Sequence, residues 1–270
     1  MIWLAALVLL ALGYAVFRVR NARKARETLL SSTLTDAERA IIAENVALYN
    51  RMPLKLRAGL EGKIRLFLDQ VDFYGAGGLD VDDDMALCIA AQACILVAAN
   101  DAWFPTLRSV ILYPGAFKSK RAEQDGFVVT ERETVRIGES WARGPVILSW
   151  ADSARGAFID DDGHNVVFHE FAHQLDDLSG ATNGLPQMAS SAEARAWAEA
   201  FNEAFERANR LLEIGKRPFL DAYGATAPEE LFAVAVEAFF ETPIELLREE
   251  PALYRALSKY FQQDPASWGV

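Results

Sequence analysis

The chain has 270 residues, 51% of them hydrophobic, and a formal net charge of −11, with 27 Lys and Arg against 38 Asp and Glu. This acidic balance argues against nucleic-acid binding, and two cysteines exclude a disulfide framework and fit a reducing compartment. The length suffices for one large domain with a substantial core.

Residues 1–17 carry no charged side chain, and we predict that they form a transmembrane anchor. Seventeen helical residues span about 26 Å, against a hydrocarbon core of about 30 Å. A basic juxtamembrane linker, residues 18–35, follows; its cations predict a cytoplasmic location for the rest of the chain and contact with anionic lipid headgroups. The alternatives are a cleaved signal peptide, which would need a basic segment before the apolar run, and a buried helix of a soluble protein.

The remaining domain, residues 36–265, changes pattern twice. The patterns of residues 36–72 and 80–100 predict helices. The second begins with a cluster of Asp residues, which we interpret as acids that favour the helix dipole, because their spacing is not that of a calcium-binding loop. Cys88 and Cys94 lie in its apolar run and are interpreted as buried small side chains. Short β-rich runs occupy 109–150, and the end is helical again, which predicts an α+β fold. We expect residues 144–150 to form a sheet edge that holds an extended peptide.

Residues 169–173 read His-Glu-Phe-Ala-His, an H-E-x-x-H motif. On a helix, His169 and His173 lie on one face and can bind one zinc ion, while Glu170 can take a proton from a water that the ion activates. The flanking residues are apolar at helical spacing, as a buried metal-bearing helix requires. The motif therefore predicts a zinc hydrolase, most readily a peptidase.

A third zinc ligand must come from elsewhere, because the only other histidine, His164, would lie about 140° around the helix from His169. A carboxylate is the usual third ligand of such sites. Ser190 and Glu193 fit a capping box, so we interpret Glu193 as a cap rather than a ligand. Thr226 and Glu229 predict a second capping box before an apolar helix that Glu230 and Glu237 interrupt on one face; the residues alone leave these two open.

The motifs as a set resemble the Mlc titration factor A family of bacterial zinc-dependent peptidases. The similarity covers most of the chain after the anchor and is carried by residues 48–53, 77–79, 89–94, 110–114, 138–141, 144–150, 169–176 and 230–234. It implies a gluzincin-like site in the half of the domain around 160–245.

The resemblance assigns roles residue by residue. His169, His173 and Glu230 match the ligands of one Zn²⁺ ion, Glu170 matches the general base, and Tyr223 matches a tyrosine that hydrogen-bonds the developing oxyanion. Glu237 then becomes a supporting residue, and Asp176 either orients an imidazole or is a plain helix-end carboxylate.

The fold that we predict is a mainly helical, zincin-like metallopeptidase domain with a small β-sheet, preceded by one transmembrane helix. The predicted function is peptide-bond hydrolysis, with aminopeptidase activity implied by the resemblance, at the inner membrane of a bacterium with the catalytic domain in the cytoplasm. Expected partners are a peptide or protein substrate, the membrane through the N-terminal helix, and no nucleic acid. The alternative function is a membrane-tethered regulatory module that sequesters a transcriptional repressor.

Overall fold

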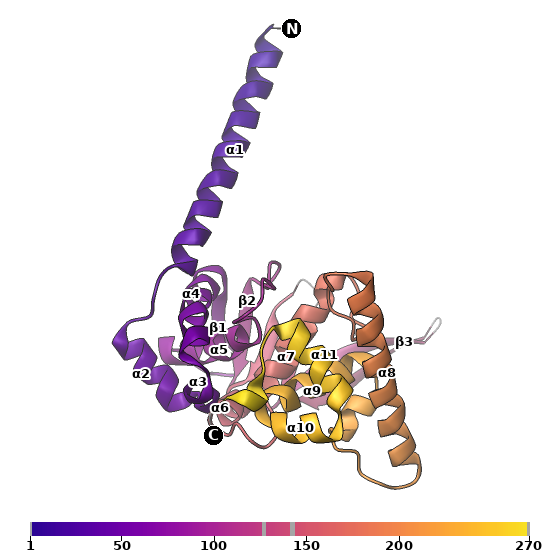
Figure 1. Ribbon diagram of the computed structural model, residues 1–270. Helices are drawn as coiled ribbons and strands as arrows, with labels where there is room; N and C mark the ends of the chain where they lie inside the picture. Colours follow the sequence, from indigo (N-terminus) through magenta and orange to yellow (C-terminus); the bar gives the residue numbers. More distant parts are fainter. Residues whose placement is uncertain (1, 126–127, 141–143, 269–270) are drawn as a thin grey trace.

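The computed structural model describes residues 2–125, 128–140 and 144–268, and it describes their side chains except in 2–10, 118–125 and 128–136. Helices surround a small sheet in one body, from which the first helix projects (Figure 1). The predicted α+β class is confirmed, with helix as the dominant element.

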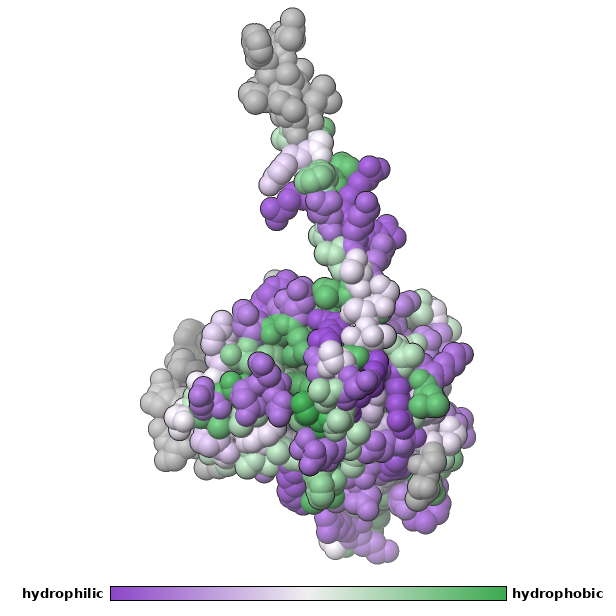
Figure 2. Space-filling model, turned by 90° about the vertical axis from the view of Figure 1, so that its left-hand side faces the viewer, coloured by the Kyte–Doolittle hydropathy of each residue, from purple (hydrophilic) through white to green (hydrophobic). Residues whose placement is uncertain are grey.

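Helix α1 (Ile2–Leu30) stands away from the body as a single rod (Figure 1). Its coloured part in Figure 2 carries both hydrophilic and hydrophobic residues, and exposed hydrophobic side chains include Leu12, Phe17 and Val19. Its end rests on α4 (Leu54–Gln70), where a Cβ at Gly62 would lie 2.0 Å from the carbonyl oxygen of Leu30, so only glycine allows this approach. Residues 18–30, predicted as a linker, continue the helix.

The predicted membrane anchor is not supported by the structure. Within the part of the chain that the structure describes, no helix combines the length and the apolar character that crossing a membrane requires. Met1 and the side chains of residues 2–10, which belong to the predicted anchor, lie outside the described residues.

The N-terminal half of the body is helical, as predicted for residues 36–72 and 80–100. It contains α2 (Asp36–Asn45), α3 (Ala47–Arg51), α4 and α5 (Asp83–Leu96). Asp82 caps α5 by accepting a hydrogen bond from the Met85 N–H at 2.8 Å, which explains part of the Asp cluster as a helix start. Cys88 and Cys94 are buried on this helix, as predicted.

The main sheet has the strand order β1-β2-β6-β5, with β1 (Asp72–Gly75), β2 (Ser109–Tyr113) and β6 (Val146–Ser149) parallel and β5 (Gly138–Ser140) antiparallel to β6. The prediction that residues 144–150 form an edge is wrong, because β6 pairs with β2 on one side and with β5 on the other. The edge next to β6 is β5. A separate hairpin consists of β3 (Phe117–Asp125) and β4 (Val128–Arg136).

The C-terminal half carries the candidate site. It comprises α6 (Trp150–Phe158), α7 (Val166–Asp176), η1 (Asp177–Ser179), α8 (Ser191–Glu213), η2 (Ala222–Ala225), α9 (Pro228–Glu241), α10 (Pro243–Glu249), α11 (Pro251–Phe261) and η3 (Pro265–Ser267). Helix α9 lies between α7 and α8 and is buried from Leu231 to Glu241, as its apolar sequence predicts.

Candidate metal centre

Helix α7 begins at a fixed point, because its N-cap Asn165 is held from two directions. The Asn165 side chain accepts a hydrogen bond from the Phe168 N–H at 3.0 Å and donates through Nδ2 to Gln92 at 3.1 Å and to the Gly156 carbonyl at 3.0 Å. Asparagine is among the preferred N-cap residues. These bonds set where along the helix axis the H-E-x-x-H residues fall.

Aromatic packing fixes how α7 is rotated. The Phe171 ring lies 5.0 Å from that of Phe104 and 5.7 Å from that of Phe67, and Phe168 lies 5.3 Å from Phe240 of α9. All five rings are buried, and each such burial contributes about 1.5–3 kcal/mol. With these faces committed to the core, His169 and His173 point toward the first turns of α9.

The start of α9 differs from the predicted capping box. Ala227 occupies the N-cap position and Pro228 the first turn, while the Thr226 hydroxyl donates to the carbonyl oxygen of Tyr223 at 2.6 Å. Proline suits a first turn because that N–H has no partner within a helix. The Thr226 prediction is therefore wrong, although the helix itself is where it was expected.

His169, His173 and Glu230 come together across the α7–α9 interface. The Nε2 atoms of His169 and His173 lie 3.1 Å and 3.4 Å from the same Glu230 carboxylate oxygen, and the two imidazole rings are 5.0 Å apart. One ligand atom from each residue lies within 4.8 Å of the other two. Two imidazole nitrogens and one carboxylate form the donor set of catalytic zinc, so these residues fit a zinc ion.

Glu237, one helical heptad after Glu230, holds His169 from behind. Its Oε1 lies 2.8 Å from His169 Nδ1, and its Oε2 accepts a hydrogen bond from the Asn165 N–H at 2.6 Å. A carboxylate at Nδ1 leaves Nε2 to face the metal position and fixes the ring orientation. By contrast, His173 Nδ1 is buried without a hydrogen-bond partner among the described residues.

The charges of this cluster are strongly coupled. Burial alone would lower the pKa of His169, but its hydrogen bonds with Glu230 and Glu237 raise that pKa well above its usual value. Burial alone would raise the pKa of Glu230, but the two imidazoles hold that pKa far below its usual range. These contacts favour the protonated form of His169 in the absence of metal, and zinc binding requires the imidazole nitrogens to be deprotonated.

Glu170 lies under the edge strand β5. A Cβ placed on Gly138 would lie 2.4 Å from Glu170 Oε1, so a side chain at position 138 would clash with this carboxylate. Strand β5 is tied to α7 a second time, because Gln174 Nε2 donates to Ser140 Oγ at 2.6 Å. The sequence analysis did not predict this contact; only the glycine at the start of the short strand β5 gives a signal for it.

Comparison with known proteins assigns the chain to a family. The model of the glucose-regulated metallo-peptidase M90 family matches residues 19–262. The chain belongs to this metallopeptidase family. The resemblance predicted from the motifs is thereby confirmed, and the chain has a metallopeptidase-type function.

Individual relatives of this M90 chain cover most of its length. An uncharacterized protein of Synechocystis sp. is 40% identical over 231 residues, 84% of this chain and 83% of its own. Mlc titration factor A of Escherichia fergusonii is 31% identical over 204 residues, 74% of this chain and 76% of its own. The protein of that name from Yersinia enterocolitica is 34% identical over 167 residues, 60% and 61% of the two chains.

Tyr223 of the M90 chain lies on the turn η2, close to the metal ligands that we predict. Its ring centroid is 6.0 Å from that of His169, and about half of the residue is exposed. Asp221 caps the turn by accepting a hydrogen bond from the Tyr223 N–H at 2.8 Å. The phenol is thus placed at the open side of the cluster.

The other residues considered from sequence lie outside the cluster. His164 precedes α7 and is exposed; its N–H donates to Asp162 and Glu241 at 2.9 Å. Ser190 caps α8 as predicted, accepting from the Glu193 N–H at 3.2 Å, and the Glu193 carboxylate pairs with Lys259. Trp141, the last residue of the segment 138–141 that carries the resemblance, lies outside the described residues.

Asp176 is fully buried at the end of α7 and fastens the following loop. Its Oδ2 accepts a hydrogen bond from the Gly184 N–H at 2.6 Å, and burial raises its pKa to about 6. Of the two roles predicted for Asp176, the structure agrees with that of a helix-end carboxylate, which is here buried and bonded to the backbone of the next loop. Its Oδ1 has no partner within the described residues, so the structure shows no bond from Asp176 to an imidazole.

Proposed function

We propose that this chain is a zinc aminopeptidase whose metal is held by His169, His173 and Glu230. The observation that carries the proposal is the convergence of the two Nε2 atoms on one carboxylate oxygen, beside Glu170 of the same H-E-x-x-H motif. Metal binding alone does not need a glutamate at that position, and membership of a metallopeptidase family supports the same chemistry.

A zinc ion held by His169, His173 and Glu230 would lower the pKa of a bound water toward neutrality and would polarise the substrate carbonyl. Glu170 is the group that accepts the proton of the attacking water and then delivers it to the leaving amine. Gly138 places the edge strand directly against this carboxylate, which restricts its movement and its access to solvent. Glu237 orients His169 during the same cycle.

Tyr223 donates a hydrogen bond to the oxyanion that develops on the substrate carbonyl. Its position beside His169, on a capped turn and partly exposed, supports this role. A well-placed oxyanion donor is worth about 2.7–4 kcal/mol. Replacing Tyr223 by Phe should therefore lower kcat and leave the zinc content unchanged.

Strand β5 is the element along which an extended substrate would lie. It pairs with β6 on one side, has no strand on the other side among the described residues, and passes over Glu170. Main-chain hydrogen bonds to a free strand edge are a general way to hold an extended peptide. On binding a substrate-like inhibitor, backbone amides of residues 138–140 should exchange more slowly, whereas those of 146–149 should not change.

Substitution of the general base tests the proposal. The variant Glu170→Gln should bind zinc as the wild type does and lose about 10²–10⁴ in kcat toward a peptide substrate. Glu193→Gln, which alters a cap-adjacent carboxylate outside the cluster, is the matched control and should keep full turnover. Undiminished turnover in zinc-loaded Glu170→Gln would refute the mechanism.

The aminopeptidase mode needs its own experiment. Peptides of one sequence with a free or an acetylated N-terminus should be incubated with the zinc-loaded protein, and the products identified by mass spectrometry. Release of single N-terminal residues from the free peptide alone supports the proposal. Internal cleavage of both peptides would instead establish an endopeptidase.

A second function is favoured by the names of the relatives, several of which are called Mlc titration factor A. In this alternative the chain sequesters a transcriptional repressor, and the zinc domain is mainly a binding module. The variant Glu170→Gln separates the two, because a cellular phenotype that depends on binding survives this substitution and one that depends on hydrolysis does not.

A further inference from the structure

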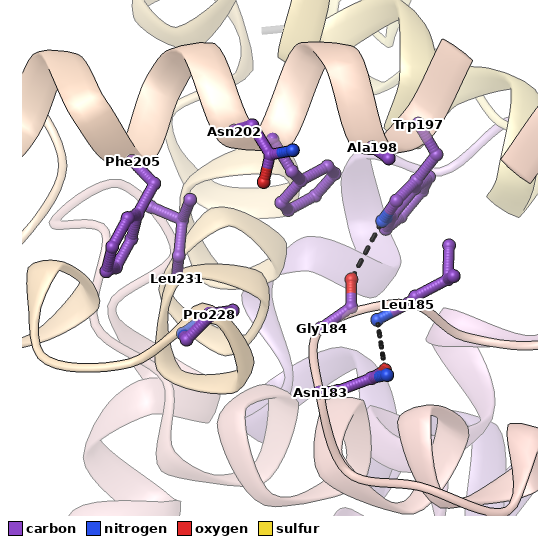
Figure 3. Close-up of a pocket in the computed structure, with 10 residues that line it drawn as sticks. Asn183, Gly184, Leu185, Trp197, Ala198, Asn202, Phe205, Pro228 and Leu231 are labelled. Atoms are coloured by element: carbon purple, nitrogen blue, oxygen red, sulfur yellow. Dashed lines mark hydrogen bonds between the residues drawn. The ribbon is translucent and has the colours of Figure 1, made fainter. Parts of the chain in front are cut away.

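A cavity of about 200 Å³ lies between α8 and the first turn of α9, and the loop at residues 183–185 forms another of its walls (Figure 3). Its apolar walls are Leu185, Trp197, Phe201, Phe205 and Leu231. Trp197, Phe201 and Leu231 are buried, whereas Asn183 and Asn202 at its border are exposed. The cavity thus has an apolar floor and a polar mouth.

The wall formed by the loop at Gly184 is fixed in place. Trp197 Nε1 donates to the Gly184 carbonyl at 2.8 Å, and the Gly184 N–H donates to Asp176 at 2.6 Å (Figure 3 shows the first of these bonds). Gly184 has a φ of +75°, and a Cβ there would lie 2.5 Å from the carbonyl oxygen of Pro228. The cavity is therefore a built feature, held between the end of α7, α8 and the start of α9.

Leu231 connects the cavity to the metal centre. It follows Glu230 directly, so the two side chains leave α9 about 100° apart. The turn that carries Tyr223 packs on the same residue, since a Cβ at Gly224 would lie 3.3 Å from Leu231 Cα. The cavity and the ligand cluster therefore lie on adjacent faces of the first turn of α9, and an extended peptide advances about 3.3–3.6 Å per residue, so a few residues would span between them.

We propose that this cavity is the specificity pocket for one apolar side chain of the peptide substrate, such as leucine or phenylalanine, within three residues of the scissile bond. The proposal rests on the proposed peptidase function. Sites for whole small ligands have volumes of about 300–1,000 Å³, so a cavity of 200 Å³ suits a single side chain. The asparagines at the mouth are placed to meet the polar backbone of the peptide, while the buried rings contact its side chain.

The test uses peptides that differ only in having Leu, Phe, Asp or Gly at each position around the scissile bond. At one position, kcat/KM should favour Leu or Phe over Gly by about ten- to a hundredfold, the range expected for burying such a side chain. The absence of a preference at every position would overturn the proposal without any variant having been made.

A substitution that fills the cavity provides a second test of the proposal. Ala198 lines the pocket on α8, and Ala198→Trp should remove most of the preference for Leu and Phe over Gly. Ala196→Trp, the same change on an exposed position of α8 that does not line the pocket, is the matched control and should keep the preference. A preference that persists in Ala198→Trp would place the pocket elsewhere.

The two proposals fail in distinguishable ways. If zinc-loaded wild type cleaves none of the peptides, the peptidase function fails, and the pocket is then judged by equilibrium binding of the same peptides to zinc-loaded Glu170→Gln. Tighter binding of the Leu and Phe peptides, lost in the double variant with Ala198→Trp but kept with Ala196→Trp, upholds the pocket. Equal binding of all peptides overturns it.

Discussion

The two ends of the α7–α9 interface use carboxylates of one helix in different ways. At the end where α9 begins, Glu230 faces two imidazole nitrogens. At the end where α7 begins, Glu237 and Glu241 accept hydrogen bonds from the N–H groups of Asn165 and His164. All three glutamates lie in a helix that is otherwise almost entirely apolar.

The difference teaches that the partner decides the role of a buried carboxylate. Glu230 contacts two imidazole nitrogens, which can bind a metal ion in their deprotonated form. These imidazoles hold the pKa of Glu230 far below its usual range. Glu241 accepts a hydrogen bond from the His164 N–H and lies near Glu237 and Asp162, and burial raises its pKa to about 9. One end is thus arranged to bind a cation, and the other is arranged to keep a carboxyl neutral and to cap α7.

Removing the carboxylate at the metal end should have the largest effect. Glu230→Ala deletes one of three ligand atoms and should lower zinc affinity by more than the 10–100-fold that loss of an outer contact costs. Activity should fall with it. Competitive titration with a zinc chelator of known affinity measures the change, and an affinity equal to that of the wild type would remove Glu230 from the ligand set.

Substitution of Glu237, which contacts both the ligand His169 and the helix start at Asn165, should have an intermediate effect. Glu237→Gln keeps the size of the side chain but weakens the contact with His169 Nδ1, so zinc affinity should fall by about 10–100-fold. Thermal melting of the metal-free protein serves as the control for the lost bond to Asn165. If the melting temperature falls but zinc affinity does not, Glu237 only supports the helix start.

Glu241 should affect stability through pH rather than through metal. Its folded pKa of about 9 exceeds the ordinary value of 4.5, so its contribution is complete below pH 4.5 and is lost as pH rises toward 9. Within that window the loss is at most about 1.4 kcal/mol per pH unit. Glu241→Gln should therefore remove part of the decline in stability between pH 6 and 9, as measured by urea unfolding. Equal pH slopes in both proteins would contradict this assignment.

The smallest effect is expected at Glu193, the glutamate that competes with Glu230 from sequence alone. Its carboxylate pairs with an exposed lysine, and exposed pairs contribute about 0–1 kcal/mol. Glu193→Ala should leave zinc affinity unchanged and shift stability by less than about 1 kcal/mol in the same unfolding assay. A loss of zinc affinity here would mean that the ligand had been assigned to the wrong glutamate.

Local patterns predicted the helices of this fold but not its strand neighbours. The apolar spacing around residues 169–173 predicts α7, and the apolar run after Pro228 predicts a buried α9. Strand β1 was missed because four residues at the end of a helical region carry too little pattern. The edge was assigned to β6 instead of β5 because pairing order depends on contacts that are distant in sequence.

The candidate site, too, could be predicted from the sequence only in part. The spacing of His169 and His173 indicates a shared ligand face, but Glu230 was separated from Glu237 only by resemblance, since both lie on one face of α9. Contacts of Glu170 with Gly138 and of Asp176 with Gly184 depend on how loops return to α7, and no local pattern encodes them. The capping box at Thr226 failed because its hydroxyl bonds back to Tyr223.

Removal and return of the metal tests the central claim most directly. The purified protein should be stripped with a chelator, and its peptide cleavage followed as zinc is added back in known amounts, with the bound metal counted by native mass spectrometry. We expect the stripped protein to be inactive and cleavage to be fully restored at one zinc per chain. Cleavage that persists in the metal-free protein, or that does not return with one bound zinc, would contradict a zinc site formed by His169, His173 and Glu230.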